Sequence, residues 1–132
     1  MIALDTNVVV RVVTEDDPEQ ARAAREAMAG QSLWVAKTVL LETEWVLRYC
    51  YKLGRNPILQ VFQHLLGYPK LEVEDRPAVL QALGWYEEGL DFADALHLSA
   101  SPPLHRLATF DKDLVRRASQ VEGCRPTELL NP

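Results

Sequence analysis

Short apolar runs alternate along the chain with longer segments in which apolar residues recur at helical spacing. The run at 2–4 is too short for a helix and is typical of a buried strand. Positions 37–52 carry apolar residues three and four apart, which predicts an amphipathic helix. The same pattern predicts strands at 2–4, 33–36, 71–73 and 106–110, a last edge strand near 129–130, and helices over 16–30, 37–52, 56–66, 75–89, 91–101 and 111–119.

Turn and cap residues separate these segments. Asp16-Asp17-Pro18 combines a capping acid with proline at the first helical position, which predicts a helix start. Asp5-Thr6-Asn7 offers three capping residue types, so a helix is expected to follow the first strand. The β-branched Val8-Val9-Val10 leaves a strand over 8–13 as the alternative. Alternating strands and helices favour the α/β class, with a parallel sheet covered by helices on both faces.

Composition supports one globular domain over residues 1–132. Of the 132 residues, 48% are hydrophobic and 25% charged, which is the balance of an ordinary folded protein. No apolar run reaches the ~18–20 residues of a membrane span, and we expect no membrane association. The first residues lack the features of a signal peptide, and the two cysteines, Cys50 and Cys124, form no disulfide framework. A cytoplasmic location is therefore expected.

Net charge argues at first against a nucleic-acid partner. The chain has 14 Lys and Arg against 19 Asp and Glu, for a formal charge of −5. A negative protein is repelled by phosphate backbones. The objection weakens if several of the acids are gathered to hold cations, because bound divalent ions cancel their charge.

Four acids from separate segments are candidates for such a site. Asp5 and Asp111 each follow an expected strand, where ligands bind in α/β folds, while Glu42 and Asp94 lie on helices that can face the same crevice. Carboxylates brought together repel one another, and Mg²⁺ or Mn²⁺ removes that repulsion. Such ions suit phosphodiester hydrolysis because they activate a water molecule and stabilise charge on phosphate.

Each acid also has a simpler interpretation. Asp5 and Asp111 stand where helix N-caps are expected, and Asp94 stands in a first helical turn, where an acid interacts with the helix dipole. Glu42 lies among apolar residues and is expected either to have a polar partner or to point to solvent, as Glu44 is expected to do.

Taken in order, these segments resemble the PIN domain, and in particular the VapC toxins of bacterial toxin–antitoxin pairs. Four motifs carry the resemblance: Leu4-Asp5-Thr6-Asn7, then residues 39–47 around Glu42, then Phe92-Ala93-Asp94-Ala95-Leu96-His97, and last residues 107–113 around Asp111. Each motif is weak alone, but four in order across almost the whole chain form a strong match.

The resemblance implies a three-layer fold in which helices flank a parallel five-stranded sheet. It also implies a Mg²⁺- or Mn²⁺-dependent endoribonuclease that hydrolyses structured RNA such as tRNA with a metal-activated water. A homodimer and inhibition by a VapB-like antitoxin are further expectations. The residues carried over as catalytic and metal-binding are Asp5, Glu42, Asp94 and Asp111, with Asp113 as a competing fourth acid, Asp91 close by, and Thr6, Asn7 and Thr109 as polar helpers.

Basic and aromatic residues allow two interpretations. Two groups of cations follow the second and fourth motifs and can either contact phosphates or form solvated helix faces: Arg48, Lys52 and Arg55, then Lys112, Arg116 and Arg117. The tryptophans Trp34, Trp45 and Trp85 can stack on bases, but packing in a core or an interface is the expected role. The helices at 37–53 and 56–66 are candidates for a dimer or antitoxin groove or for an internal core.

Other functions remain possible on sequence grounds. A phosphoacceptor signalling domain also binds Mg²⁺ with acids at strand ends, but it requires a phosphoacceptor acid on a central strand, and 71–75 is a poor match. A PIN fold that only binds a partner is disfavoured by the retention of all four acids. A PIN nuclease that acts on other nucleic acid, outside a toxin–antitoxin pair, stays open.

Overall fold

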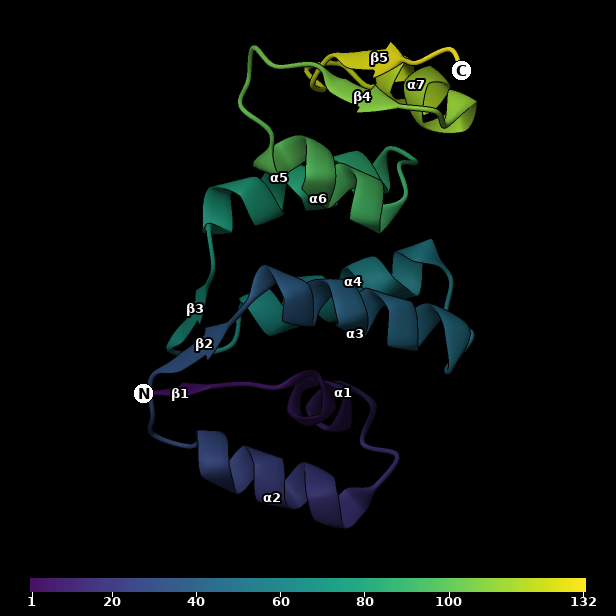
Figure 1. Ribbon diagram of the computed structural model, residues 1–132. Coiled ribbons are helices and arrows are strands. Elements are labelled where there is room, and N and C mark those ends of the chain that lie inside the picture. Colours follow the sequence, from purple (N-terminus) through teal and green to yellow (C-terminus); the bar gives the residue numbers. More distant parts are fainter. The chain divides into compact units, whose positions relative to one another are not determined.

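The protein is described here by a computed structural model that covers residues 1–132. It consists of two compact units, Met1–Arg76 and Pro77–Pro132 (Figure 1). No helix is both long enough and apolar enough to cross a membrane.

The first unit is built on three parallel strands. Its elements are β1 (Ile2–Ala3), α1 (Thr6–Thr14), α2 (Pro18–Met28), β2 (Leu33–Val35), α3 (Lys37–Tyr49), α4 (Arg55–Leu66) and β3 (Leu71–Val73). The strand order is β1-β2-β3, and Leu33 is paired with Ile2 on one side and with Leu71 on the other. Helix α1 packs between α2 and α3, and α3 also packs on α4.

The second unit contains a smaller parallel pair of strands. Its elements are α5 (Arg76–Glu87), whose first residue closes the first unit, α6 (Phe92–Ala100), β4 (Leu107–Thr109), α7 (Lys112–Gln120) and β5 (Thr127–Leu129). Strands β4 and β5 pair in parallel, and α7 packs on both of them. Within this unit, Tyr86 of α5 meets Phe92 of α6 edge to face, with ring centroids 5.4 Å apart.

The α/β class and the positions of the elements are confirmed. Residues 6–14 are helical, so the alternative of a strand over 8–13 is wrong. Backbone N–H groups of Val8 and Val9 donate to the Asp5 carbonyl, which starts the helix despite the β-branched run. All five expected strands are present, but their hydrogen bonds do not form a single five-stranded sheet. Strands β1, β2 and β3 pair in parallel with one another, and β4 pairs in parallel with β5. Each ladder joins strands of one unit, three in the first and two in the second.

The core of the first unit lies beneath α3 and α4. Leu40 and Leu47 on α3 and Ile58 and Phe62 on α4 are all 0% exposed. Their spacing along each helix places them on one face, as the apolar pattern predicts. The burial of these large side chains is the main stabilising term for this half of the chain.

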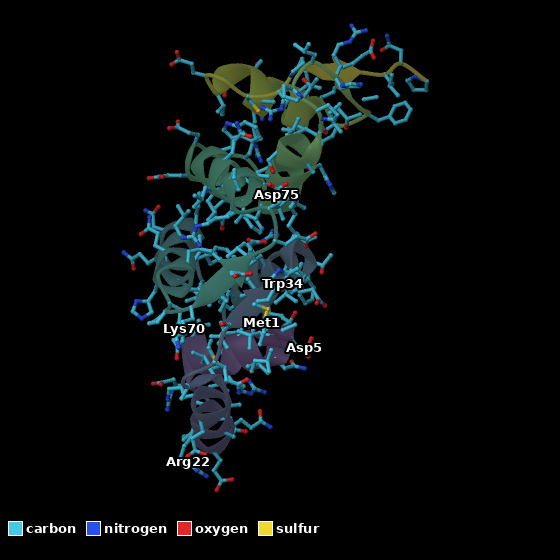
Figure 2. All side chains as sticks on the ribbon, turned by 90° about the vertical axis from the view of Figure 1, so that its left-hand side faces the viewer. Met1, Asp5, Arg22, Trp34, Lys70 and Asp75 are labelled. Atoms are coloured by element: carbon cyan, nitrogen blue, oxygen red, sulfur yellow. The ribbon has the colours of Figure 1, made fainter.

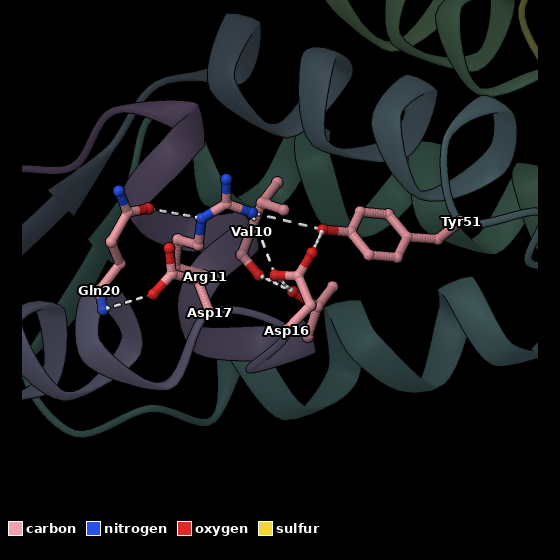
Figure 3. Close-up of polar contacts among 7 residues, drawn as sticks. Val10, Arg11, Asp16, Asp17, Gln20 and Tyr51 are labelled. Atoms are coloured by element: carbon pink, nitrogen blue, oxygen red, sulfur yellow. Dashed lines mark hydrogen bonds and ion pairs between the residues drawn. The ribbon is translucent and has the colours of Figure 1, made fainter.

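A polar cluster closes the connection between α1 and α2, and no local sequence pattern predicts it. Arg11 donates from Nε to Gln20 Oε1 (2.7 Å) and from Nη1 to Asp16 Oδ1 (3.1 Å) (Figure 3). The Tyr51 hydroxyl, which lies beyond the end of α3, donates to Asp16 Oδ2. That hydrogen bond, assisted by Thr14 and Arg11, lowers the pKa of Asp16. Asp17 caps α2 by accepting from Gln20 N, as predicted.

We expect Phe62→Ala to destabilise the protein by about 3–5 kcal/mol, because it removes a fully buried ring and leaves a cavity. Urea unfolding followed by circular dichroism measures the change. The neighbouring variant Gln63→Ala, on the exposed side of α4, is the matched control and should change the free energy of unfolding by less than about 0.5 kcal/mol. Equal losses in the two variants would contradict this assignment of the core.

Candidate metal site

Asp5 stands between β1 and α1, at the carboxyl end of the first strand. The backbone N–H of Leu4 donates to the Trp34 carbonyl (2.9 Å), and this bond extends the pairing of β1 with β2 up to the residue before Asp5. Asp5 occupies the N-cap position of α1, but its side chain accepts no capping hydrogen bond. The carboxylate is exposed and lies at the margin of the first unit in Figure 2. The simple capping role for this acid is therefore wrong, and its oxygens are available to a ligand.

Glu42 is linked to the beginning of α1 through Thr6. The Thr6 hydroxyl donates to Glu42 Oε1 (2.8 Å), across 36 residues of sequence. Thr6 is 7% exposed and directly follows Asp5, whereas Glu42 is exposed on α3. The structure thus brings Glu42 to the residue next to Asp5 and gives it both a polar partner and exposure to solvent. Asn7, the third polar residue of this motif, is exposed.

Asp94 lies in the first turn of α6 beside two other carboxylates. Asp91 is the N-cap of this helix and accepts from the Asp94 backbone N–H (3.3 Å). Partial burial raises the pKa of Asp94, and the negative charges of Asp91 and Asp111 raise it further. The charges of His97 and Arg117 act in the opposite direction. The second unit therefore brings Asp94 and Asp111 within electrostatic reach of each other.

Asp111 caps α7, as its position predicts, but through one oxygen only. Its Oδ1 accepts from the backbone N–H groups of Asp113 (2.9 Å) and Leu114 (3.1 Å). The Asp111 backbone N–H donates to the Thr109 hydroxyl (3.0 Å), which fixes the turn after β4. Because neither capping bond uses Oδ2, capping and ligand binding are compatible in this residue.

Asp113 differs from Asp111 in its surroundings. It accepts from Arg116 Nη2 (2.9 Å), one turn farther along α7, and its side chain is 68% exposed. An exposed pair of this kind is a common surface feature of helices.

The structure corrects the expectation for Glu44 and decides between the two interpretations of Arg48 and Arg116. Glu44 does not point to solvent: it is 1% exposed, and its two oxygens accept from Arg48 Nε (2.9 Å) and Nη2 (3.1 Å). Arg48 and Arg116 are thus both engaged with acids rather than open to phosphates. The i, i+4 spacing of Glu44 and Arg48 was the available sequence signal for this ion pair.

The three tryptophans differ in how far they are exposed. Trp85 is 5% exposed and lies beneath the Arg125 guanidinium, at 5.6 Å from the ring centroid, so its expected packing role is confirmed. Trp34 is half-buried in β2. Trp45 is 52% exposed, so it is not a core residue.

The donor set fits a hard divalent cation. The candidate acids supply only carboxylate oxygens, the ligands that Mg²⁺ and Mn²⁺ prefer. No group of three or more His, Cys, Asp or Glu side chains in the structure is arranged as a metal site. Within the first unit, Glu42 is bonded to Thr6, the residue after Asp5, and within the second unit, the charge of Asp111 acts on Asp94. Burial is the largest cause of the raised pKa of Asp94 and repulsion by Asp91 and Asp111 adds to it, and a bound cation would offset both.

Comparison with known families identifies the class of protein. The PIN domain matches residues 2–120, which spans nearly the whole chain and all four acidic motifs. The chain belongs to the PIN-domain family, whose members are generally metal-dependent nucleases that act on nucleic acid. No curated protein and no solved structure is significantly similar to the chain.

The pKa of Asp94 predicts that Asp94→Asn stabilises the metal-free protein near neutral pH. The pKa of the unfolded carboxyl lies near its ordinary value of 3.8, and the pKa of the folded one is higher. The folded state therefore binds more protons in that window, and stability falls as pH rises through it. The gain from Asp94→Asn should be absent below the unfolded pKa and complete above the folded pKa, at about 1 kcal/mol or less because solvent screens a half-buried group.

Urea unfolding in EDTA between pH 3 and pH 8 measures this gain. Asp113→Asn is the matched control, because its acid is exposed and paired with Arg116. A gain for Asp94→Asn that does not depend on pH would show that lost repulsion is not its cause.

Proposed function

We propose that the protein is a Mg²⁺- or Mn²⁺-dependent endoribonuclease in which Asp5, Glu42, Asp94 and Asp111 hold the metal. The observation that carries this proposal is that a PIN domain covers all four acids, with Glu42 bonded to Thr6, the neighbour of Asp5, and with the charge of Asp111 raising the pKa of Asp94. The four acids also remove much of the objection from net charge, because their charges are offset when cations are bound.

The bound ion would orient and acidify a water molecule and offset charge on the phosphate. The chain's own residues hold the ligands in place. The Thr6 hydroxyl restrains Glu42, and the Thr109 hydroxyl fixes the backbone of Asp111. Supporting bonds of this kind orient ligand oxygens, and their loss weakens metal sites. RNA cleavage in this way leaves a 5′-phosphate and a 3′-hydroxyl.

We assign the fourth acid to Asp111 rather than Asp113. The charge of Asp111 acts on Asp94, whereas Asp113 is engaged by Arg116. The cap made by Oδ1 holds the Asp111 side chain in one orientation, and Oδ2 is not used by that cap.

Replacing any one of the four acids by its amide should reduce metal-dependent cleavage of total tRNA by roughly 100-fold or more, beyond the 10- to 100-fold typical of a lost supporting partner. The amides keep the shape of the side chains. Asn is as good an N-cap as Asp, so Asp111→Asn should not unfold α7, and Asp5 makes no side-chain cap to lose. Gel analysis of tRNA incubated with Mn²⁺ or with EDTA measures the activity.

Asp113→Asn is the matched control and should cleave tRNA at close to the wild-type rate. Circular dichroism should show unchanged helix content for every variant. Full activity of Asp5→Asn would refute the metal assignment, and loss of activity in Asp113→Asn but not in Asp111→Asn would exchange the roles of those two acids.

We further propose that the nuclease is the toxin of a VapBC-type pair, acts in the cytoplasm and forms a homodimer. A cavity of about 640 Å³ in the first unit, lined by both apolar and polar side chains, supports a site for the antitoxin. Its walls come from α1, α2 and α4 and include Val12, Val13, Val61 and Leu65. Glu15 and Arg25, which form an ion pair, also line it. Such a groove suits the apolar face of an amphipathic segment.

Val61→Arg should prevent inhibition by the antitoxin and leave tRNA cleavage intact, because a long cation on α4 obstructs the cavity. Cleavage with and without a VapB-like antitoxin that inhibits the wild-type protein provides the measurement. Gln63→Arg adds the same charge to the exposed side of α4 and is the control. Equal inhibition of wild type and Val61→Arg would exclude the groove as the antitoxin site.

A further inference from the structure

Two aromatic side chains are exposed side by side on α3. Trp45 is 52% exposed and Tyr49 48% exposed, and their ring centroids lie 5.0 Å apart with the planes tilted by 40°. The opposite side of the same helix carries Leu40 and Leu47, which are fully buried. The packing of α3 on the core therefore does not explain why positions 45 and 49 carry aromatic side chains. Large exposed aromatic side chains of this kind mark interaction sites.

The aromatic pair shares a helix face with Glu42. Residues 42, 45 and 49 stand at positions i, i+3 and i+7, which lie along one side of a helix. One helical turn advances about 5.4 Å. Trp45 therefore begins about one turn from the carboxylate, and Tyr49 follows one turn beyond it.

Tyr49 contacts Arg48, which is itself paired with the buried carboxylate of Glu44. The Arg48 guanidinium lies 4.7 Å from the centroid of the Tyr49 ring, and its Nη1 donates to the Tyr49 hydroxyl (3.4 Å). Its other nitrogens bind both oxygens of Glu44, which is itself 1% exposed. Because Arg48 already restrains the Tyr49 ring, little side-chain entropy is lost when a ligand stacks on the two aromatic rings.

We propose that Trp45 and Tyr49 form a stacking platform for unpaired nucleobases next to the cleaved phosphate. This inference rests on the proposed function, since it takes Glu42 as a metal ligand. Bases stack on aromatic rings without regard to sequence, because every base presents a π-face. Bases in a duplex have their faces covered by their neighbours, so the platform selects a loop or a single-stranded segment of RNA. Lys52, exposed just beyond α3, provides a cation for an adjacent phosphate.

The test is binding of a short fluorescein-labelled single-stranded RNA in EDTA, where cleavage is prevented, measured by anisotropy. Trp45→Ala should weaken binding about 10-fold or more, and Tyr49→Ala should weaken it less. Trp45→Phe keeps a stacking ring and should retain most of the affinity. Leu80→Ala removes an equally exposed apolar side chain, 49% exposed on α5, and should bind as the wild type does.

Several outcomes would overturn the platform. Equal affinity of wild type and Trp45→Ala for the single strand would do so, as would an equal loss of affinity for a fully paired RNA. A wild-type dimer that Trp45→Ala converts to a monomer in sedimentation equilibrium would assign the face to contact between copies of the chain instead.

Mn²⁺ titration by calorimetry separates this inference from the proposed function. Trp45→Ala should bind Mn²⁺ as the wild type does. If Asp5→Asn retains cleavage while Trp45→Ala still loses RNA affinity, the metal assignment fails and the stacking platform stands as a binding site.

Discussion

Repulsion between like charges is the constraint that the arrangement of acids in this chain has to meet. At Asp94, burial is the largest cause of the raised pKa, and the carboxylates of Asp91 and Asp111 raise it further. Glu42 shows one answer, a hydroxyl from Thr6 that binds one of its oxygens. Asp111 shows another, a helix N-terminus that satisfies a single oxygen. Hydrogen bonds therefore hold Glu42 and Asp111, from a side chain 36 residues away in the first case and from the backbone of the following helix in the second.

Glu44 is also a carboxylate that needs stabilisation, but its partner is a cation rather than a hydroxyl or a helix N-terminus. It lies two residues from Glu42 on α3 but is buried, and a bidentate guanidinium neutralises it. That pairing has a structural effect, since the same guanidinium rests on Tyr49. Two glutamates within one turn of α3 therefore differ in role because one faces the core and the other faces solvent.

The sequence predicted the elements well because their boundaries are marked locally. Asp17 with Pro18 begins α2, and Asp111 begins α7, through contacts spanning only a few residues. Features that depend on distant contacts were not predictable in this way. The burial of Glu44, the exposure of Trp45 and the division of the strands into two sheets all depend on which faces meet after folding. Of the candidate site, the types and order of the acids were readable, whereas the Thr6–Glu42 bond across 36 residues was not.

The cluster of Arg11, Asp16 and Tyr51 has a consequence for how this chain tolerates change. Glu15 adopts a left-handed backbone (φ 56°), Asp16 accepts a hydrogen bond from the Tyr51 hydroxyl, and Asp17 caps α2. Three consecutive residues therefore each have a separate structural role. One inserted residue would break the turn at Glu15, the hydrogen bond to Asp16 or the cap made by Asp17. This connection is therefore fixed in length. The segment around Leu104, whose side chain is 94% exposed, carries no comparable set of bonds and is where insertions among relatives of this protein are expected to accumulate.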